Sequence, residues 1–114
     1  MVGLIDLKYG PYTVEIEALI ERIKTITPEQ AKAMLDAYDD AMKFEETWNA
    51  WRSALSAENY SGRGSMREAA LNAALSDKWY AARYTVLAML VRDLISPDRF
   101  NALYGPWASV MEKQ

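Results

Sequence analysis

Carboxylates are the side chains of this sequence with the greatest capacity for chemistry, because the chain contains neither histidine nor cysteine. That composition removes the commonest general base, the thiolate nucleophile and most transition-metal ligands. All-helical magnesium-dependent nucleotide pyrophosphatases use pairs of acids a few residues apart on facing helices. Asp36, Asp39 and Asp40 supply one such group, but the later chain offers no second pair of that spacing. We expect these acids to form a solvated helix face.

Asp77 is the more unusual acid, because it falls on an otherwise apolar heptad stripe, beside two aromatic residues. In apolar surroundings its pKa would rise unless a basic residue such as Arg52 or Lys43 paired with it. A perturbed acid marks candidate sites, although structural ion pairs perturb carboxylates as well. A small magnesium-dependent hydrolase acting on nucleotides through Asp36, Asp40 and Asp77 is therefore the first alternative function.

Aromatic side chains form the candidate interaction surface. Their amphipathic rings suit both interface hot spots and small-molecule pockets, although core packing is their ordinary role. So many rings are difficult to bury completely in a protein of 114 residues, so we expect at least one in an interface or groove. The candidate residues are Trp48, Trp51, Trp79, Tyr80, Tyr84 and Trp107.

Helices are the elements that must position these residues. Pro28 and the next proline, Pro97, enclose a stretch whose only two glycines lie near its middle, on either side of Arg63. Proline and glycine are the strongest interruptions of a helix, so this stretch predicts two long helices, about 28–57 and 65–95. A short connection between them favours antiparallel pairing, as in a helical hairpin.

Start signals at three points support this division. Residues 27–30 (Thr-Pro-Glu-Gln) and 96–98 (Ser-Pro-Asp) each combine a capping residue, a proline at the first helical position and an acid. Residues 65–68 (Ser-Met-Arg-Glu) match a capping box, as the first segment does. We expect a helix to begin at each of these points.

The fold class predicted is a small all-α bundle of about four helices in one domain, 1–114. A shorter helix over about 11–25 precedes the hairpin, and the last helix follows Ser96 and is kinked or restarted at Gly105 and Pro106. Residues 1–10 form an extended arm. The later half of the 65–95 helix is apolar on most sides, so it should be the most buried helix of the bundle.

Charge and hydropathy set limits on partners. The net charge is only −3, with an acidic first half and a mildly basic stretch over 61–92, so the two hairpin helices could pair within or between chains. Nucleic acid is an unlikely partner for an acidic chain without a helix-turn-helix pattern, and a DNA-binding regulator is the second alternative. The most apolar run, 84–91, is too short to cross a membrane, and no secretory leader is recognisable, so a cytoplasmic protein is expected.

Three segments resemble small helical proteins of unknown function from actinobacteria and their phages. The segments are Ile-Thr-Pro-Glu-Gln at 26–30, Val-Arg-Asp-Leu-Ile at 91–95 and Tyr-Gly-Pro-Trp at 104–107. The resemblance implies an intracellular all-helical protein and carries no activity or catalytic residues. It adds a phage-encoded, host-directed binding protein to the functions considered.

These observations lead to one functional expectation. The chain is a non-enzymatic protein-protein interaction module whose long hairpin presents apolar surface to a second copy or to another protein. No cofactor and no metal are expected.

Overall fold

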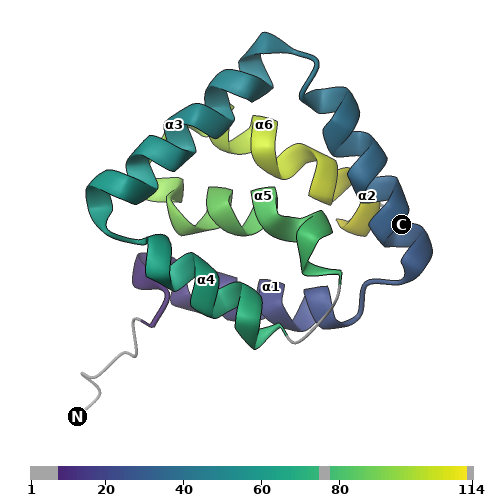
Figure 1. Cartoon of the computed structure of the whole chain (residues 1–114), viewed down its shortest axis with the longest axis horizontal. Helices are drawn as coiled ribbons and strands as arrows, with labels where there is room; N and C mark the ends of the chain where they lie inside the picture. The colour runs from purple at the N-terminus through teal and green to yellow at the C-terminus, as the bar shows by residue number, and fades with distance from the viewer. Residues whose placement is uncertain (1–7, 75–77, 113–114) are drawn as a thin grey trace.

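Every regular element within residues 8–74 and 78–112, the parts that the computed structural model describes, is helical (Figure 1). Three of the four prolines stand in the first turn of a helical segment, where a missing backbone N–H is tolerated. The α-helices are α1 (Thr13–Lys24), α2 (Pro28–Ala41), α3 (Glu45–Ser61), α4 (Gly64–Ala73), α5 (Trp79–Leu90) and α6 (Pro97–Trp107). Single turns of 3₁₀-helix, η1 (Gly10–Tyr12) and η2 (Arg92–Leu94), and a π-helical turn, η3 (Ala108–Glu112), complete the order.

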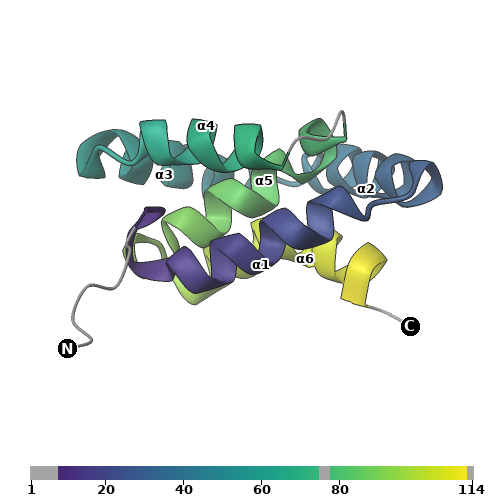
Figure 2. The same ribbon diagram turned by 90° about the horizontal axis from the view of Figure 1, so that it is seen from below.

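The helices form two layers (Figure 2), with α2, α3 and α4 in one and α1 and α6 in the other. Helix α5 passes through the middle and packs against all five other α-helices. Its sequence is apolar on nearly every side, and its residues from Thr85 to Leu90 are all buried. The expectation that this segment is the most buried helix is therefore confirmed.

The single helix expected over 28–57 is wrong, because α2 ends at Ala41, α3 begins at Glu45, and Phe44 between them has extended backbone (φ −94°, ψ 136°). The physical reason is that α2 and α3 each bury one stripe of side chains, and the two stripes do not share a helix face. On one continuous helix of 3.6 residues per turn they would face roughly opposite sides, so the chain must turn to bury both. The stripes are Ala31, Met34 and Tyr38 on α2, and Thr47, Ala50, Ala54 and Glu58 on α3.

The helix expected over 65–95 is also divided. Helix α4 ends at Ala73 and α5 begins at Trp79, and the two pack against each other. Helix α3, for its part, packs chiefly on α6 and α5. Six α-helices thus occupy the described residues where four were expected, and the long antiparallel hairpin is not confirmed.

Two of the three expected start signals are confirmed. Thr27 and Gln30 form a capping box, in which the Gln30 N–H donates to Thr27 Oγ1 at 3.1 Å and the Thr27 N–H donates to Gln30 Oε1 at 3.0 Å. Ser96 Oγ accepts from the Arg99 N–H at 3.2 Å. The capping box expected at Ser65 is wrong, because α4 already begins at Gly64 and has no side-chain cap.

The helices expected at the two ends of the bundle are found. Helix α1 occupies most of the predicted range 11–25. Helix α6 continues through Pro106 to Trp107 and then widens into the π-helical turn η3, so the chain changes its helical form just after the predicted kink. Residues 1–7 of the expected extended arm lie outside the described residues, and Gly10 belongs to η1.

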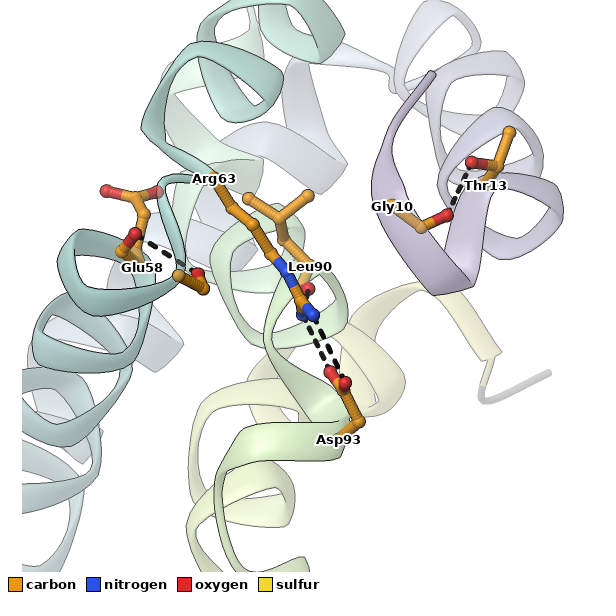
Figure 3. A network of polar contacts seen from close by, with 7 residues as sticks. Gly10, Thr13, Glu58, Arg63, Leu90 and Asp93 are labelled. Atoms are coloured by element: carbon orange, nitrogen blue, oxygen red, sulfur yellow. Dashed lines mark hydrogen bonds and ion pairs between the residues drawn. The ribbon is translucent and has the colours of Figure 1, made fainter. Parts of the chain in front are cut away.

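Hydrogen bonds of Arg63 connect the corner between α3 and α4 to the end of α5 (Figure 3). Arg63 Nη1 donates to Leu90 O at 3.0 Å and to Asp93 Oδ1 at 2.7 Å, and its Nη2 donates to Asp93 Oδ2 at 3.2 Å. This bond to Arg63 holds the pKa of Asp93 below its usual value. Gly10 approaches the same corner with φ +78°, and a Cβ there would lie 3.6 Å from Met66 Sδ. Arg63 thus joins the start of α4 to the end of α5 and to η2, and η1 packs beside this corner.

Two further polar groups of the interior are satisfied. The buried carboxylate of Glu58 accepts from Arg67 Nε at 2.5 Å and from Arg67 Nη2 at 3.2 Å. In the core, Tyr38 OH donates to Leu103 O at 2.6 Å and lies 2.7 Å from Thr85 Oγ1. Because the phenol has one proton, Thr85 must be the donor to Tyr38. Burial raises the pKa of Tyr38 well above its usual value, so this phenol stays neutral.

Candidate functional site

Exposed aromatic residues at the turn from α2 into α3 form the candidate site, which we term the aromatic corner (Phe44, Trp48 and Trp51). Phe44 is the N-cap residue of α3, and the other two follow at spacings of four and three residues, which places all three on one helix face. Phe44 is 63% exposed and Trp48 is 45% exposed. Trp51 is half-buried against the core, and its ring centroid lies 4.9 Å from that of Trp48. The aromatic corner thus consists of two exposed rings, Phe44 and Trp48, and a third ring, Trp51, that packs against the core.

The small residues of α3 explain why large rings lie outside. The buried stripe of this helix consists mainly of alanine and threonine, which allow α3 to approach α5 and α6 closely. The aromatic corner is displaced from that stripe by about one residue, or 100° around the helix. Large side chains therefore stand at the flank of the contact instead of inside it.

Acidic residues surround the aromatic corner. Asp39 and Asp40 precede it at the end of α2, and Glu45 begins the first turn of α3, where it also complements the helix dipole. Asp40 pairs with Lys43 at 3.3 Å. Asp39 and Glu45 have no ion-pair partner among the residues that the structure describes. The corner thus combines apolar surface with uncompensated negative charge.

The six candidate aromatic residues are distributed differently from the expectation. Trp107 is 1% exposed and lies in the core, and Tyr84 is half-buried, with its ring centroid 4.8 Å from that of Tyr38. Trp79 and Tyr80 are exposed at the start of α5, 42% and 39% respectively. Among the described residues, no ring contact connects them with Trp48 or Trp51. The structure therefore brings together only the two tryptophans of α3.

Phe44 is the member of the corner that was absent from the candidate residues. The apolar stripe of an uninterrupted 28–57 helix would have covered it. Its exposure follows from the fact that α2 and α3 bury different faces. In the sequence this change is marked mainly by the alanines of α3, and alanine is a weak indicator of a buried stripe.

The acidic candidates are solvated or lie outside the described residues. Asp36 pairs with Lys32 at 3.0 Å on the exposed face of α2, and Asp40 pairs with Lys43. Asp77 belongs to the segment 75–77, which the structure does not describe. In the described ranges, no three acids come close enough to hold a metal ion.

Comparisons with known proteins give no family assignment. The chain matches no protein-family model, no curated protein and no solved structure. Within residues 8–74 and 78–112, no helix combines the length and apolarity required to cross a lipid bilayer. Function must therefore be argued from the residues themselves.

Proposed function

We propose that this chain is a non-enzymatic protein-binding module and that the aromatic corner is its contact surface. The observation that carries the proposal is the exposure of Phe44 and Trp48 beside a half-buried Trp51. Aromatic side chains dominate the binding energy of protein interfaces, particularly where they form a cluster. Exposed apolar side chains that lie together, unlike ones scattered singly, mark sites of protein interaction, so the exposed rings of Phe44 and Trp48 suit a partner.

The charge around the corner selects the partner's chemistry. Asp39 and Glu45 have no ion-pair partner among the described residues, so a partner carrying lysine or arginine beside apolar residues would complement both features. We infer a basic amphipathic helix, which can place an apolar stripe against the rings and cations toward the acids. An actinobacterial or phage setting, as the sequence resemblance implies, would make a host protein the source of that helix.

Binding to synthetic helices tests this proposal. A leucine-lysine amphipathic peptide should bind with a dissociation constant on the order of micromolar by calorimetry, whereas a leucine-glutamate peptide of the same apolar pattern should not bind. Trp48→Ser should weaken the interaction at least about tenfold. Tyr60→Ser is the matched control, because Tyr60 is also an exposed ring of α3, 93% exposed, but lies at the opposite end of the helix.

Sedimentation equilibrium distinguishes a second copy from another protein. The proposal expects a monomer at concentrations where the basic peptide binds. A dimer abolished by Trp48→Ser would show that the corner binds its own chain instead. Equal binding of the peptide by the wild-type protein and Trp48→Ser would contradict the proposed surface.

A further inference from the structure

The arginines of this chain differ sharply in how their side chains are satisfied. Of the seven arginines, five donate a hydrogen bond to another group of the protein. Four of those five also pair with a carboxylate or lie over an aromatic ring. Arg52 and Arg99 are the other two, and their side chains have no partner among the described residues. Both of them line the same groove.

That groove lies between α3 and the segment that leads from η2 into α6, and its volume is about 500 Å³. Helix α3 contributes Asn49, Ser53 and Ser56 beside Arg52, and the facing side contributes Arg99. An amide and two hydroxyls thus add neutral hydrogen-bond donors to the two guanidinium groups. No carboxylate lines this groove.

The charges of the adjoining surface confine the positive region. A second groove shares Asn49 and Arg99 with the first and is also lined by Glu46 and Asp98. These carboxylates would repel an anion there, so the end of the surface near Arg52 is the favourable one. No carboxylate of the first groove compensates the positive charges of Arg52 and Arg99. An anion bound near Arg52 would therefore reduce the repulsion between these two side chains.

We propose that the Arg52 and Arg99 groove binds an organic oxyanion, a phosphate or carboxylate group carried on a small apolar body. Guanidinium groups present paired N–H donors that match the oxygens of both anions. Leu94 and Ile95 supply apolar surface on the same wall, and the volume of the groove falls in the range of small-molecule sites. An ion alone would leave that apolar wall uncovered.

This binding site is independent of the protein-binding proposal. Asn49, Ser53 and Ser56 lie on one flank of α3, and the aromatic corner lies on the other. Failure of either proposal therefore leaves the other standing.

Titration of ¹⁵N-labelled protein followed by NMR tests the site, at constant ionic strength so that general screening does not change. The probes are phenyl phosphate, benzoate, inorganic phosphate and phenol. We expect phenyl phosphate or benzoate to saturate, with amide shifts confined to 49–57 and 94–99, and to bind more tightly than inorganic phosphate. Phenol, which lacks the negative charge, should cause no saturable shift. The comparison of phenyl phosphate with benzoate identifies the preferred oxyanion.

Charge-removing variants complete the test. Arg52→Gln and Arg99→Gln should each weaken binding of the preferred probe at least about tenfold, as the loss of a charge-assisted hydrogen bond requires. Arg83→Gln removes the same charge from α5, where Arg83 lies over the Tyr84 ring, and should leave the affinity unchanged within about twofold. Absence of saturable binding by both aromatic anions, shifts outside the groove, or equal weakening by Arg83→Gln would each overturn the proposal.

Discussion

Arg63 and Asp93, thirty residues apart in the sequence, form a paired contact in which Arg63 Nη1 donates to Asp93 Oδ1 at 2.7 Å and Arg63 Nη2 donates to Asp93 Oδ2 at 3.2 Å. Arg63 is only 14% exposed in its side chain, and it also donates to Leu90 O. The contact joins the start of α4 to the turn that follows α5. It is the kind of tertiary contact that local sequence patterns do not reveal.

The stability of the protein should depend on pH through Asp93. The Arg63 bond lowers the pKa of Asp93 in the folded protein, so its contribution is complete above the unfolded pKa, about 4, and is lost as pH falls through the lower folded pKa. Asp93→Asn should therefore reduce the free energy of unfolding by about 1 kcal/mol at pH 7, since the carboxylate is partly exposed. Urea unfolding at several pH values measures this difference.

The same series supplies its own control. The gap between wild type and Asp93→Asn should close in acid, where the carboxyl of the wild type is also neutral. Glu17→Gln removes an exposed acid of α1 that lies beyond its first turn and has no ion-pair partner among the described residues, and should change stability little at any pH. A gap of constant size down to pH 2 would show that the charge of Asp93 is irrelevant.

Removal of the Tyr38 hydroxyl should destabilise the core. Tyr38→Phe leaves Leu103 O without its donor and Thr85 without its acceptor, both in buried surroundings, and should cost about 1–3 kcal/mol. Thr85→Val should cost less alone, because Tyr38 keeps its bond to Leu103. Chemical unfolding of the two single variants and the double variant measures the coupling. Strictly additive costs would contradict a shared hydrogen-bond network.

Local signals predicted much of this fold. Thr27 and Ser96 cap their helices through bonds to residues three positions away, so a short segment contains all the necessary chemistry. Ser65 fulfils the same rule but does not cap. At that corner the position of Arg63 is set by Asp93 and Leu90, which are distant in sequence. Helix existence was therefore easier to predict than the points at which helices turn.

The candidate site was harder to predict, because exposure depends on which face of α3 turns inward. Trp48 and Trp51 were candidate interaction residues together with Trp107, because ring size alone suits both a core and an interface, and the stripe of α3 that is buried contains Ala50 and Ala54. Alanines allow close helix contact, and whether they are buried depends on α5 and α6, which pack against α3 from later in the sequence. Trp107, at the other extreme, lies wholly in the core.

Two glycines with different backbone conformations should respond oppositely to the same substitution. Gly62 ends α3 with φ +72°, and a Cβ there would meet no atom within 4 Å, so Gly62→Ala should cost about 1 kcal/mol through backbone strain alone. Gly64, the first residue of α4, does not have a positive φ, and a Cβ there would lie in ordinary contact with Glu58 Oε1 at 3.8 Å, so Gly64→Ala should stabilise the protein by about 0.4–1 kcal/mol. Thermal unfolding of both variants measures the sign, and Gly62→Asn should lose less than Gly62→Ala.

Substitutions of Trp48 and Leu103 separate a ring kept for binding from a residue kept for folding. Leu103 is fully buried on the inner face of α6, so Leu103→Ala should cost about 2–5 kcal/mol through lost burial and the cavity left behind. Trp48→Ser removes a ring that is nearly half exposed, and its cost should stay below about 1 kcal/mol. Urea midpoints measured under identical conditions provide the comparison. If Trp48→Ser lowered the stability as much as Leu103→Ala does, the Trp48 ring would serve the fold. Its exposure would then no longer support the aromatic corner as a binding surface.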